Sequence, residues 1–341
     1  MIDPSIPLID LHRHLDGNVR LETILDLASQ HGVALPAQDV EGLREAVQVT
    51  RPLDDLLQFL AKFSWLTAVM VDEAACRRIA YENVEDALRE GIDYVELRFS
   101  PWFMAETHGL DPQAVVEAVV DGATAGARDT GVMVKLIGIL SRTYGPANAT
   151  RELEALLAHR DALVALDLAG DEVRVPGALF VDHFRRARDA GLEVTVHAGE
   201  AAGAESVWQA LDSLGARRIG HGVRAIDDPA LVERLAAERI GIESCLTSNV
   251  QTGTVPSFAE HPLRRFLAAG VPATINTDDP AISGIDLANE YEVAAPAAGL
   301  SPKWTRQAQL NALEVAFLTD DERRQLLQKK RGAAEPGPAE G

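Results

Sequence analysis

The stretch Pro7-Leu-Ile-Asp-Leu-His-Arg-His14 joins a short apolar run to two histidines that are one residue apart. Side chains at positions i and i+2 of an extended chain point to the same side. His12 and His14 can therefore bind one metal ion from the end of a single strand. Such a pair is weak evidence alone, and its weight comes from the recurrence of the same pattern along the chain.

Three later segments repeat this order of apolar strand and polar tip. They are Val194-Thr-Val-His-Ala-Gly-Glu200, Ile219-Gly-His-Gly222 and Thr274-Ile-Asn-Thr-Asp-Asp279. Zinc is bound in proteins by nitrogen and oxygen ligands, and a catalytic zinc site keeps one position open for water. We therefore predict one zinc ion per chain, held at the strand ends by four residues: His12, His14, His197 and Asp278.

The same segments supply candidate acid and base groups. Burial of Glu200 beside apolar groups would raise its pKa and keep it protonated, as an acid requires; a glutamate stabilised at a helix N-terminus is the alternative. His221 could hold or deprotonate an attacking water, or it could be a hydrogen-bonded core histidine. Asp279 directly follows Asp278, so the two side chains diverge and Asp279 could orient the nucleophile.

Composition limits the class of protein. The chain has 341 residues, of which 47% are hydrophobic, and 52 acidic against 32 basic side chains give a formal charge of −20. A surface this acidic argues against nucleic acid or an anionic membrane as a partner. Two cysteines, Cys76 and Cys245, are too few for a disulfide framework. With no evident signal peptide or membrane span, we predict a cytoplasmic protein.

Short β-rich runs alternate with helical patterns along the chain. Strict alternation predicts an α/β fold, a (β/α)8 TIM barrel with its site at the strand C-termini, and an open doubly wound sheet is the alternative. The predicted strands are 8–12, 94–100, 134–140, 164–169, 193–198, 218–221, 241–246 and 272–277. The predicted helices between and after them are 111–130, 177–190, 204–215, 228–238, 257–269 and, as extra C-terminal helices, 301–329.

The first crossover is far longer than one barrel helix needs. Helical patterns at 20–31, 52–69 and 72–90 predict a helical insertion after the first strand, and long excursions of this kind usually carry function. One helix face in it is apolar, which fits either core packing or a lid over a ligand; its residues are Leu56, Phe59, Leu60 and Phe63. We expect a single domain over residues 1–330 and a disordered tail at 331–341.

Taken together, these motifs resemble those of the adenosine deaminase family, over residues 5 to about 325 and in the same order. Gly170, at the predicted tip of the fourth strand, belongs to one of them; alone it would indicate a tight turn or a close approach of a ligand to the backbone. The matching segments are His12-Arg-His-Leu-Asp-Gly17, Leu168-Ala-Gly-Asp-Glu172, His197-Ala-Gly-Glu200, Gly220-His-Gly222, Ser248-Asn249 and Asn276-Thr-Asp-Asp279.

The resemblance implies a role for each candidate residue. It makes His12, His14, His197 and Asp278 the zinc ligands, and Glu200 the acid that protonates purine N1. A zinc-activated water, helped by His221 and Asp279, would attack C6 and convert adenosine or 2′-deoxyadenosine to the inosine product and ammonia, a reaction of purine salvage. The family also implies substrate contacts, by a backbone N–H to purine N3, a carboxylate to the ribose 5′-hydroxyl and an apolar flap; the residues concerned are His14, Asp16, Gly170, Asp279, Leu56, Phe59, Leu60 and Phe63.

Other readings of the same residues remain open. Adenine deaminases share the barrel and the ligand set, but a glutamate commonly follows their first His-Leu, where this chain has Asp16. Zinc deaminases of the cytidine and tRNA type use a Cys-x-x-Cys motif, which this sequence lacks. A catalytically silent barrel that binds metal or nucleoside would not need both Glu200 and His221. The predicted partner is a small purine nucleoside, with no obligatory protein partner evident.

Overall fold

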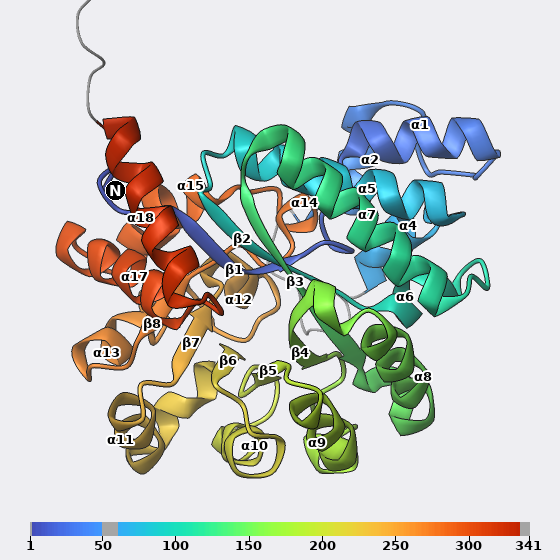
Figure 1. Ribbon diagram of the computed structural model, residues 1–341. Coiled ribbons are helices and arrows are strands. Elements are labelled where there is room, and N and C mark those ends of the chain that lie inside the picture. Colours follow the sequence, from blue (N-terminus) through green and yellow to red (C-terminus); the bar gives the residue numbers. More distant parts are fainter. Residues whose placement is uncertain (1, 50–60, 335–341) are drawn as a thin grey trace, which may run out of the picture.

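The computed structural model describes residues 2–49 and 61–334. Figure 1 shows strands at the centre and helices around them. The strands are β1 (Ile9–His14), β2 (Tyr94–Phe99), β3 (Met133–Ser141), β4 (Leu163–Ala169), β5 (Glu193–Ala198), β6 (Arg218–His221), β7 (Gly241–Ser244) and β8 (Ala273–Ile275). Each coincides with a predicted strand, although β7 and β8 are shorter than predicted.

The strands form one sheet in chain order from β1 to β8, and every neighbouring pair is parallel. β8 meets β1 through a bridge between Arg13 and Asp278. There the amide of His14 donates to the carbonyl of Asp278, and the amide of Asp278 to the carbonyl of His12, each at 2.8 Å. A doubly wound sheet would reverse its strand order, so the barrel prediction is confirmed and the open-sheet alternative is wrong.

Helices follow the strands around the outside of the barrel (Figure 1). After β2 to β4 they are α6 (Pro101–Glu106), α7 (Pro112–Thr130), η2 (Arg142–Tyr144), α8 (Gly145–Ala158), η3 (Arg160–Ala162), η4 (Gly177–Phe180) and α9 (Val181–Asp189). After β5 to β7 they are α10 (Ala204–Gln209), the π-helix η5 (Ala210–Leu214), η6 (Val223–Asp227), α11 (Pro229–Ala237), α12 (Leu246–Gln251), η7 (Phe258–Glu260) and α13 (Leu263–Ala268).

The chain after β8 remains helical almost to the end of the described residues. Its elements are α14 (Pro280–Ser283), α15 (Leu287–Asn289), η8 (Glu290–Ala294), α16 (Ala295–Ala297), α17 (Pro302–Val315) and α18 (Asp320–Ala334). α18 therefore includes the first residues of the segment that was predicted to be disordered, and residues 335–341 lie outside the described part of the chain. Helix α8 was not predicted, because its buried stripe of Ala149, Leu153 and Leu156 is short and is interrupted by the buried carboxyl group of Glu152.

The long first crossover is helical, as predicted. Its described elements are α1 (Leu21–His31), α2 (Val40–Val47), η1 (Ala61–Phe63), α4 (Ser64–Thr67) and α5 (Glu73–Arg89). The predicted helix over 52–69 lies partly outside the described residues, and its described part is the short pair η1 and α4. Asp72 caps α5 by accepting a hydrogen bond from the amide of Ala75 at 2.8 Å, which marks where this helix begins.

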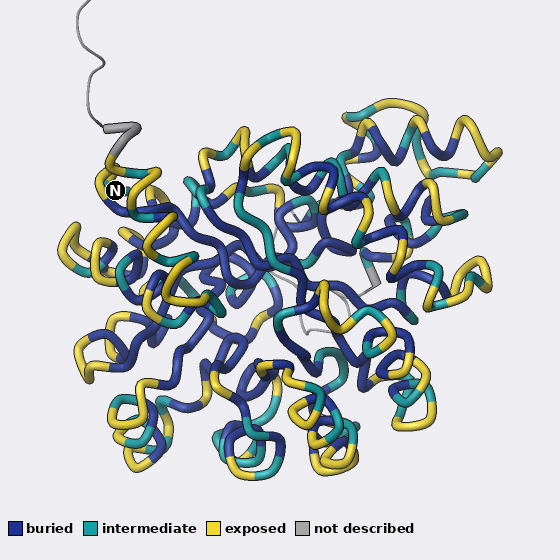
Figure 2. Tube along the Cα trace, in the orientation of Figure 1, coloured by how far each residue is buried: buried dark blue, intermediate teal, exposed yellow. Residues whose placement is uncertain are grey.

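The barrel interior is charged, unlike the branched aliphatic filling typical of this fold. Arg98 pairs with Asp167 and Glu243 at 2.8 Å each, and Arg218 pairs with Glu243 at 2.6 Å and with Glu96. All five side chains are buried. Figure 2 shows the strands as the buried centre, with exposed residues on the outer helix faces. Among the described residues, no helix is both long and apolar enough to cross a membrane.

Candidate active site

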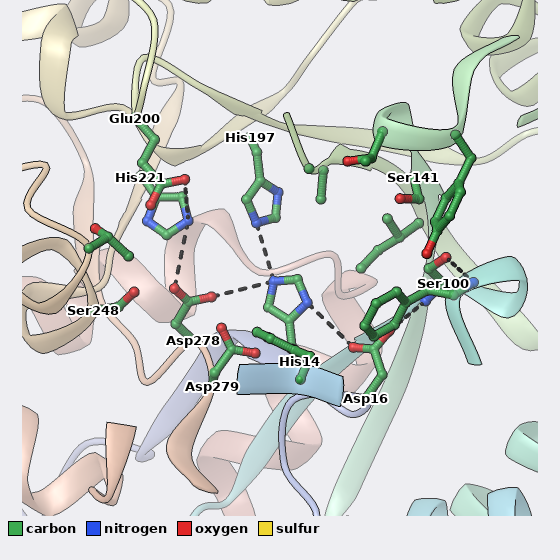
Figure 3. A pocket seen from close by; sticks show the side chains of 18 residues that line it. His14, Asp16, Ser100, Ser141, His197, Glu200, His221, Ser248, Asp278 and Asp279 are labelled. Atoms are coloured by element: carbon green, nitrogen blue, oxygen red, sulfur yellow. Dashed lines mark hydrogen bonds and ion pairs between the residues drawn. The ribbon is translucent and has the colours of Figure 1, made fainter. Parts of the chain in front are cut away.

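A cavity of about 250 Å³ opens among the strand C-termini (Figure 3). Most predicted polar site residues line it, together with aromatic side chains from the insertion and from the segment after β2. The lining residues are His14, Asp16, Phe63, Ser100, Phe103, Ile139, Ser141, Thr143, Tyr144, Ala169, Gly170, His197, Glu200, His221, Ser248, Thr252, Asp278 and Asp279.

The predicted metal ligands meet at one point beside this cavity. Nε2 of His197 lies 3.1 Å from Nε2 of His12 and 3.2 Å from Nε2 of His14. Oδ1 of Asp278 lies 3.2 Å from the nitrogen of His12 and 3.4 Å from that of His14. These four residues form a metal-binding cluster, with one ligand atom of each within 4.8 Å of the others.

The hydrogen bonds behind two of these rings test whether the cluster fits a cation. Nδ1 of His12 lies 2.8 Å from Oε2 of Glu243, and Nδ1 of His197 lies 2.9 Å from Oδ2 of Asp167. A carboxylate only accepts, so each Nδ1 carries the proton and each Nε2 keeps a lone pair. Lone pairs that converge with a carboxylate at 3 Å repel one another unless a cation lies between them, so the donor set fits a divalent metal.

The backing carboxylates stay ionised despite their burial. Burial alone would raise the pKa of Asp167, but the charge of Arg98 and the hydrogen bond from His197 outweigh it and lower that pKa. The pKa of Glu243 is likewise held well below its usual value, against burial, by Arg98 and Arg218. The charged barrel interior therefore supplies anionic acceptors to the ligand histidines.

A second group of possible ligand atoms includes His221, Cys245 and Asp278. Burial raises the pKa of the Cys245 thiol well above its usual value. A thiol binds metals as the thiolate, so the environment of Cys245 disfavours it as a ligand. The cluster around His12 and His197 therefore remains the better metal site.

Glu200 is buried just beyond the end of β5 and points into the cavity (Figure 3). Burial, reinforced by the charges of Asp278 and Glu172, raises its pKa from 4.5 to about 8. Its Oε2 lies 3.7 Å from Nε2 of His221, which is also 3.8 Å from Oδ2 of Asp278. A carboxyl group that keeps its proton at neutral pH is suited to protonate a ligand in this cavity.

The loop that carries Glu200 is held by a second buried carboxylate, Glu172. Glu172 accepts hydrogen bonds from four consecutive backbone amides and one hydroxyl; the donors are Gly199, Glu200, Ala201 and Ala202, and the side chain of Ser206. An anion in a nest of amides is a stable arrangement. The conformation of the loop, and with it the direction of Glu200, therefore depends on Glu172.

Asp278 and Asp279 both line the cavity, but only Asp278 belongs to the metal-binding cluster. Asp278 has a positive φ of 68°, and its Oδ1 belongs to the metal-binding cluster. Oδ1 of Asp279 is buried without a hydrogen-bond partner within the described residues. Burial and the charge of Asp278 raise the pKa of Asp279 well above its usual value. A side chain at Gly17 would collide with Asp279, which explains a glycine at that position.

Two predicted substrate residues border the other side of the cavity. Oδ2 of Asp16 accepts a hydrogen bond from the amide of Ser100 at 3.0 Å, whereas Oδ1, 3.5 Å from Nδ1 of His14, has no hydrogen-bond partner in the described part of the chain. Gly170 has φ of 110°, and a Cβ there would collide with Thr143. Glycine is therefore required at this position both for its backbone conformation and for its close packing.

The predicted apolar face is described only in part. Phe63 lines the cavity, with its ring 5.7 Å from that of Phe103. Leu56, Phe59 and Leu60 lie outside the described residues. Phe63 thus places at least the end of this face beside the site.

The comparison with known proteins agrees with this geometry. A sequence model of the family described as adenosine deaminase matches residues 7–331. An adenosine deaminase of Serratia proteamaculans is 60% identical over 97% of this chain and 100% of its own length. One of Salmonella schwarzengrund is 60% identical over 98% and 100%, respectively. This chain belongs to the adenosine deaminase family.

Solved structures of related proteins have the same fold as this member of the adenosine deaminase family. An adenine deaminase from Arthrobacter aurescens superposes with a TM-score of 0.89 at 30% identity, over 97% of this chain and 100% of that one. An amidohydrolase from Burkholderia ambifaria with bound Zn superposes with a TM-score of 0.85 at 26% identity, over 97% and 91%. The barrel and its extra helices are therefore an arrangement shared with an adenine deaminase and with an amidohydrolase that binds Zn.

Several residues of this family member's site were not predicted from sequence. Asp167 and Glu243 are charged residues within otherwise apolar strands, a signal that could have marked them as functional. Ser100 and Ser141 lie at the ends of the second and third strands, where the strand-tip rule applies equally well. His261, which belongs to none of the predicted motifs, is buried, and its Nε2 lies 3.1 Å from Oδ1 of Asn249.

Proposed function

We propose that this chain catalyses the hydrolytic deamination of adenosine and 2′-deoxyadenosine, in which water adds to C6 and ammonia leaves to give inosine or deoxyinosine. The observation that carries the proposal is the placement of Glu200: a buried carboxyl with a pKa raised to about 8 lies in the same cavity as the metal-binding cluster. Family membership and the 60% identity with adenosine deaminases support the choice of reaction.

His12, His14, His197 and Asp278 would hold the metal, which we propose to be Zn²⁺ because the donors are imidazoles and a carboxylate. When bound, zinc supplies the Lewis acidity that makes water nucleophilic near neutral pH. The backing carboxylates Glu243 and Asp167 keep His12 and His197 in the ligand tautomer. The protein thus prepares the site before the metal arrives.

Glu200 would donate its proton to purine N1, which withdraws electrons from C6 and makes that carbon electrophilic. The raised pKa serves this step, because an ionised carboxylate has no proton to give. His221 and Asp279 lie beside Glu200 and Asp278 and would orient the attacking water. The cavity excludes most solvent from these groups, which strengthens each hydrogen bond to the substrate.

The rest of the cavity would select the nucleoside. We propose that Oδ1 of Asp16, which is buried without a hydrogen-bond partner among the described residues and lies 3.5 Å from Nδ1 of His14, accepts the ribose 5′-hydroxyl. The backbone N–H at Gly170 would donate to purine N3, and Phe63 would cover an apolar face of the nucleoside. His14 and Asp279 also line this space.

The test compares ammonia release and the ultraviolet change on adenosine, 2′-deoxyadenosine, adenine, AMP and cytidine, with bound metal measured on the same preparation. We expect rapid turnover of the two nucleosides with about one zinc per chain. A clear preference for adenine would indicate the sister activity instead and would remove Asp16 from its role. No turnover of any of these with metal bound would favour a silent binding barrel.

The variant Glu200→Gln distinguishes an active deaminase from a catalytically silent barrel that only binds metal or nucleoside. It keeps the shape of the side chain but cannot deliver the proton, so we expect zinc retention and a loss of turnover of about 10²–10⁴-fold. Thermal unfolding and metal content serve as controls for folding. Near-normal turnover in this variant would overturn the role of Glu200.

A further inference from the structure

A chain of buried hydrogen bonds leads to His221 from behind and ends at a backbone amide. The amide of Leu263, at the start of α13, donates to Nδ1 of His261 at 3.1 Å. Nε2 of His261 lies 3.1 Å from Oδ1 of Asn249, and Nδ2 of Asn249 lies 3.0 Å from Nδ1 of His221. The three side chains are at most 4% exposed.

The amide of Leu263 fixes the donor and acceptor of every hydrogen bond in this series, because a backbone N–H can only donate. Nδ1 of His261 must therefore be the acceptor, so its proton is on Nε2, and this N–H donates to the carbonyl oxygen of Asn249. The amide nitrogen of Asn249 then donates to Nδ1 of His221. With its Nδ1 accepting, a neutral His221 carries its proton on Nε2.

These hydrogen bonds also require His261 to be neutral. A second proton on Nδ1 of His261 would face the N–H of Leu263, and two donors would then oppose each other without an acceptor. Burial, together with the nearby His221, lowers the pKa of His261 to about 3. The same argument applies at the other end: a proton on Nδ1 of His221 would oppose the amide nitrogen of Asn249.

We propose that His261 and Asn249 are positioning residues that hold His221 as the Nε2–H tautomer, so that His221 presents a hydrogen-bond donor, and no lone pair, to the reaction centre. Nε2 of His221 is the atom that faces Glu200 and Asp278, at 3.7 and 3.8 Å. Within the function proposed above, His221 thus donates to the attacking oxygen and does not take its proton. From the sequence alone, His221 could either hold the attacking water or deprotonate it.

Nitrogen NMR of the zinc-loaded protein tests the proposal directly. Histidine is labelled with ¹⁵N on the ring, and the His221 signals are assigned from the spectrum of His221→Gln. Protonated and unprotonated ring nitrogens have well-separated shifts, so the spectrum states which atom carries the proton. We expect an unprotonated Nδ1 and a protonated Nε2 in His221. The reverse assignment in the wild-type protein would overturn the proposal.

The variant Asn249→Asp should reverse the direction of the hydrogen bond between residue 249 and His221. A carboxylate has the size of the amide but only accepts, so we expect His221 to carry a proton on Nδ1 in this variant. Asn249 does not line the cavity, so kcat is expected to fall by about 10–100-fold with a smaller change in KM. Unchanged His221 signals and kcat in this variant would contradict the proposal.

His261→Gln is the matched conservative change. Glutamine can present an N–H near the position of Nε2 and still donate to Asn249, so the tautomer of His221 should persist in this variant. A reversal of the His221 signals in His261→Gln would show that His261 does not act through its donor. The signals are read without substrate, so this result is independent of whether adenosine is the substrate.

Discussion

His197 and His221 are buried histidines at the ends of the neighbouring strands β5 and β6, but their rings are held in opposite ways. Behind His197 stands the carboxylate of Asp167, which only accepts, so Nε2 keeps a lone pair for a metal. Behind His221 stands the amide nitrogen of Asn249, which only donates, so Nε2 carries a proton. We therefore expect the partner behind the ring to decide that His197, and not His221, binds the metal.

Asp167 and Asn249, the partners of the two rings, also differ in whether their own neighbour is charged or neutral. Asp167 is paired with Arg98 at 2.8 Å, so it remains an anion in the barrel interior. Asn249 bonds instead to the neutral ring of His261 at 3.1 Å. A charged hydrogen-bond partner thus supports His197, the proposed metal ligand, and a neutral one supports His221.

The largest expected effect comes from removing each ring in turn. His197→Ala should lose both metal and turnover, because it removes a ligand from the cluster. His221→Ala should keep the metal and lose turnover, because its Nε2 is a donor. Metal content by mass spectrometry and ammonia release measure the two outcomes. If His221→Ala lost the metal as completely as His197→Ala, the distinction between the two histidines would fail.

The next effect is expected from the partner of His197. In Asp167→Asn, metal affinity should fall by about 10–100-fold. Oδ1 of Asp167 accepts from the amide of Leu168 at 2.7 Å, and Oδ2 faces both His197 and Arg98. An amide NH₂ would therefore oppose a donor in either orientation. Competition with a zinc-binding dye measures the affinity.

Asp161→Asn is the matched control for this variant. Asp161 lies just before β4 and its side chain is 97% exposed, so the same exchange there should leave metal affinity unchanged. Thermal unfolding of both variants separates a weaker site from a weaker fold. A wild-type affinity in folded Asp167→Asn would show that the backing carboxylate does not tune the ligand.

The sequence predicts the barrel well because parallel strands buried on both faces are continuous apolar runs. The ligand set is predicted for the same reason: a strand-end rule needs only the strand and the residue after it, as at His197 and Asp278. Both predictions depend on local patterns, and local patterns are visible in one sequence.

The residues that orient those ligands are less visible. Glu243 and His12 are far apart in the chain, and only barrel closure brings them to 2.8 Å. The link from His261 through Asn249 to His221 depends on where α12 ends and α13 begins, which no periodicity reveals. Support of this kind is set by tertiary packing, so a sequence gives the reacting groups more readily than their hydrogen-bond partners.

A smaller effect is expected from Asp16, which backs the third ligand. Oδ1 of Asp16 is 3.5 Å from Nδ1 of His14, a longer separation than behind His12 or His197. Asp16→Ala should therefore weaken metal binding less than Asp167→Asn. It should lower kcat/KM for adenosine by about 1.5–3 kcal/mol, the value of one hydrogen bond to a charged group. 5′-Deoxyadenosine, which lacks the hydroxyl, should lose less, and equal losses on both substrates would remove Asp16 from ribose recognition.

The smallest effect on catalysis, but a measurable one on stability, is expected from Glu290, a buried carboxyl group that pairs with no cation in the described part of the chain. Glu290 accepts from the amide of Thr247 at 3.3 Å, and burial raises its pKa from 4.5 to about 8. Asp167, in contrast, has Arg98 beside it and a lowered pKa. The two carboxyls therefore contribute to the pH dependence of stability with opposite signs.

For Glu290 the folded state binds the proton more tightly than the unfolded chain. The resulting stability is fully present below pH 4.5 and is lost as pH rises towards about 8. The slope from one such group is at most about 1.4 kcal/mol per pH unit. Glu290→Gln, which does not titrate, should flatten the fall in the free energy of unfolding by urea between pH 6 and 8, relative to wild type. Glu292→Gln, on the same element but exposed, should keep the wild-type slope. Identical slopes in all three proteins would mean that Glu290 is already ionised in the fold, and burial without a cation would then not suffice to hold a proton here.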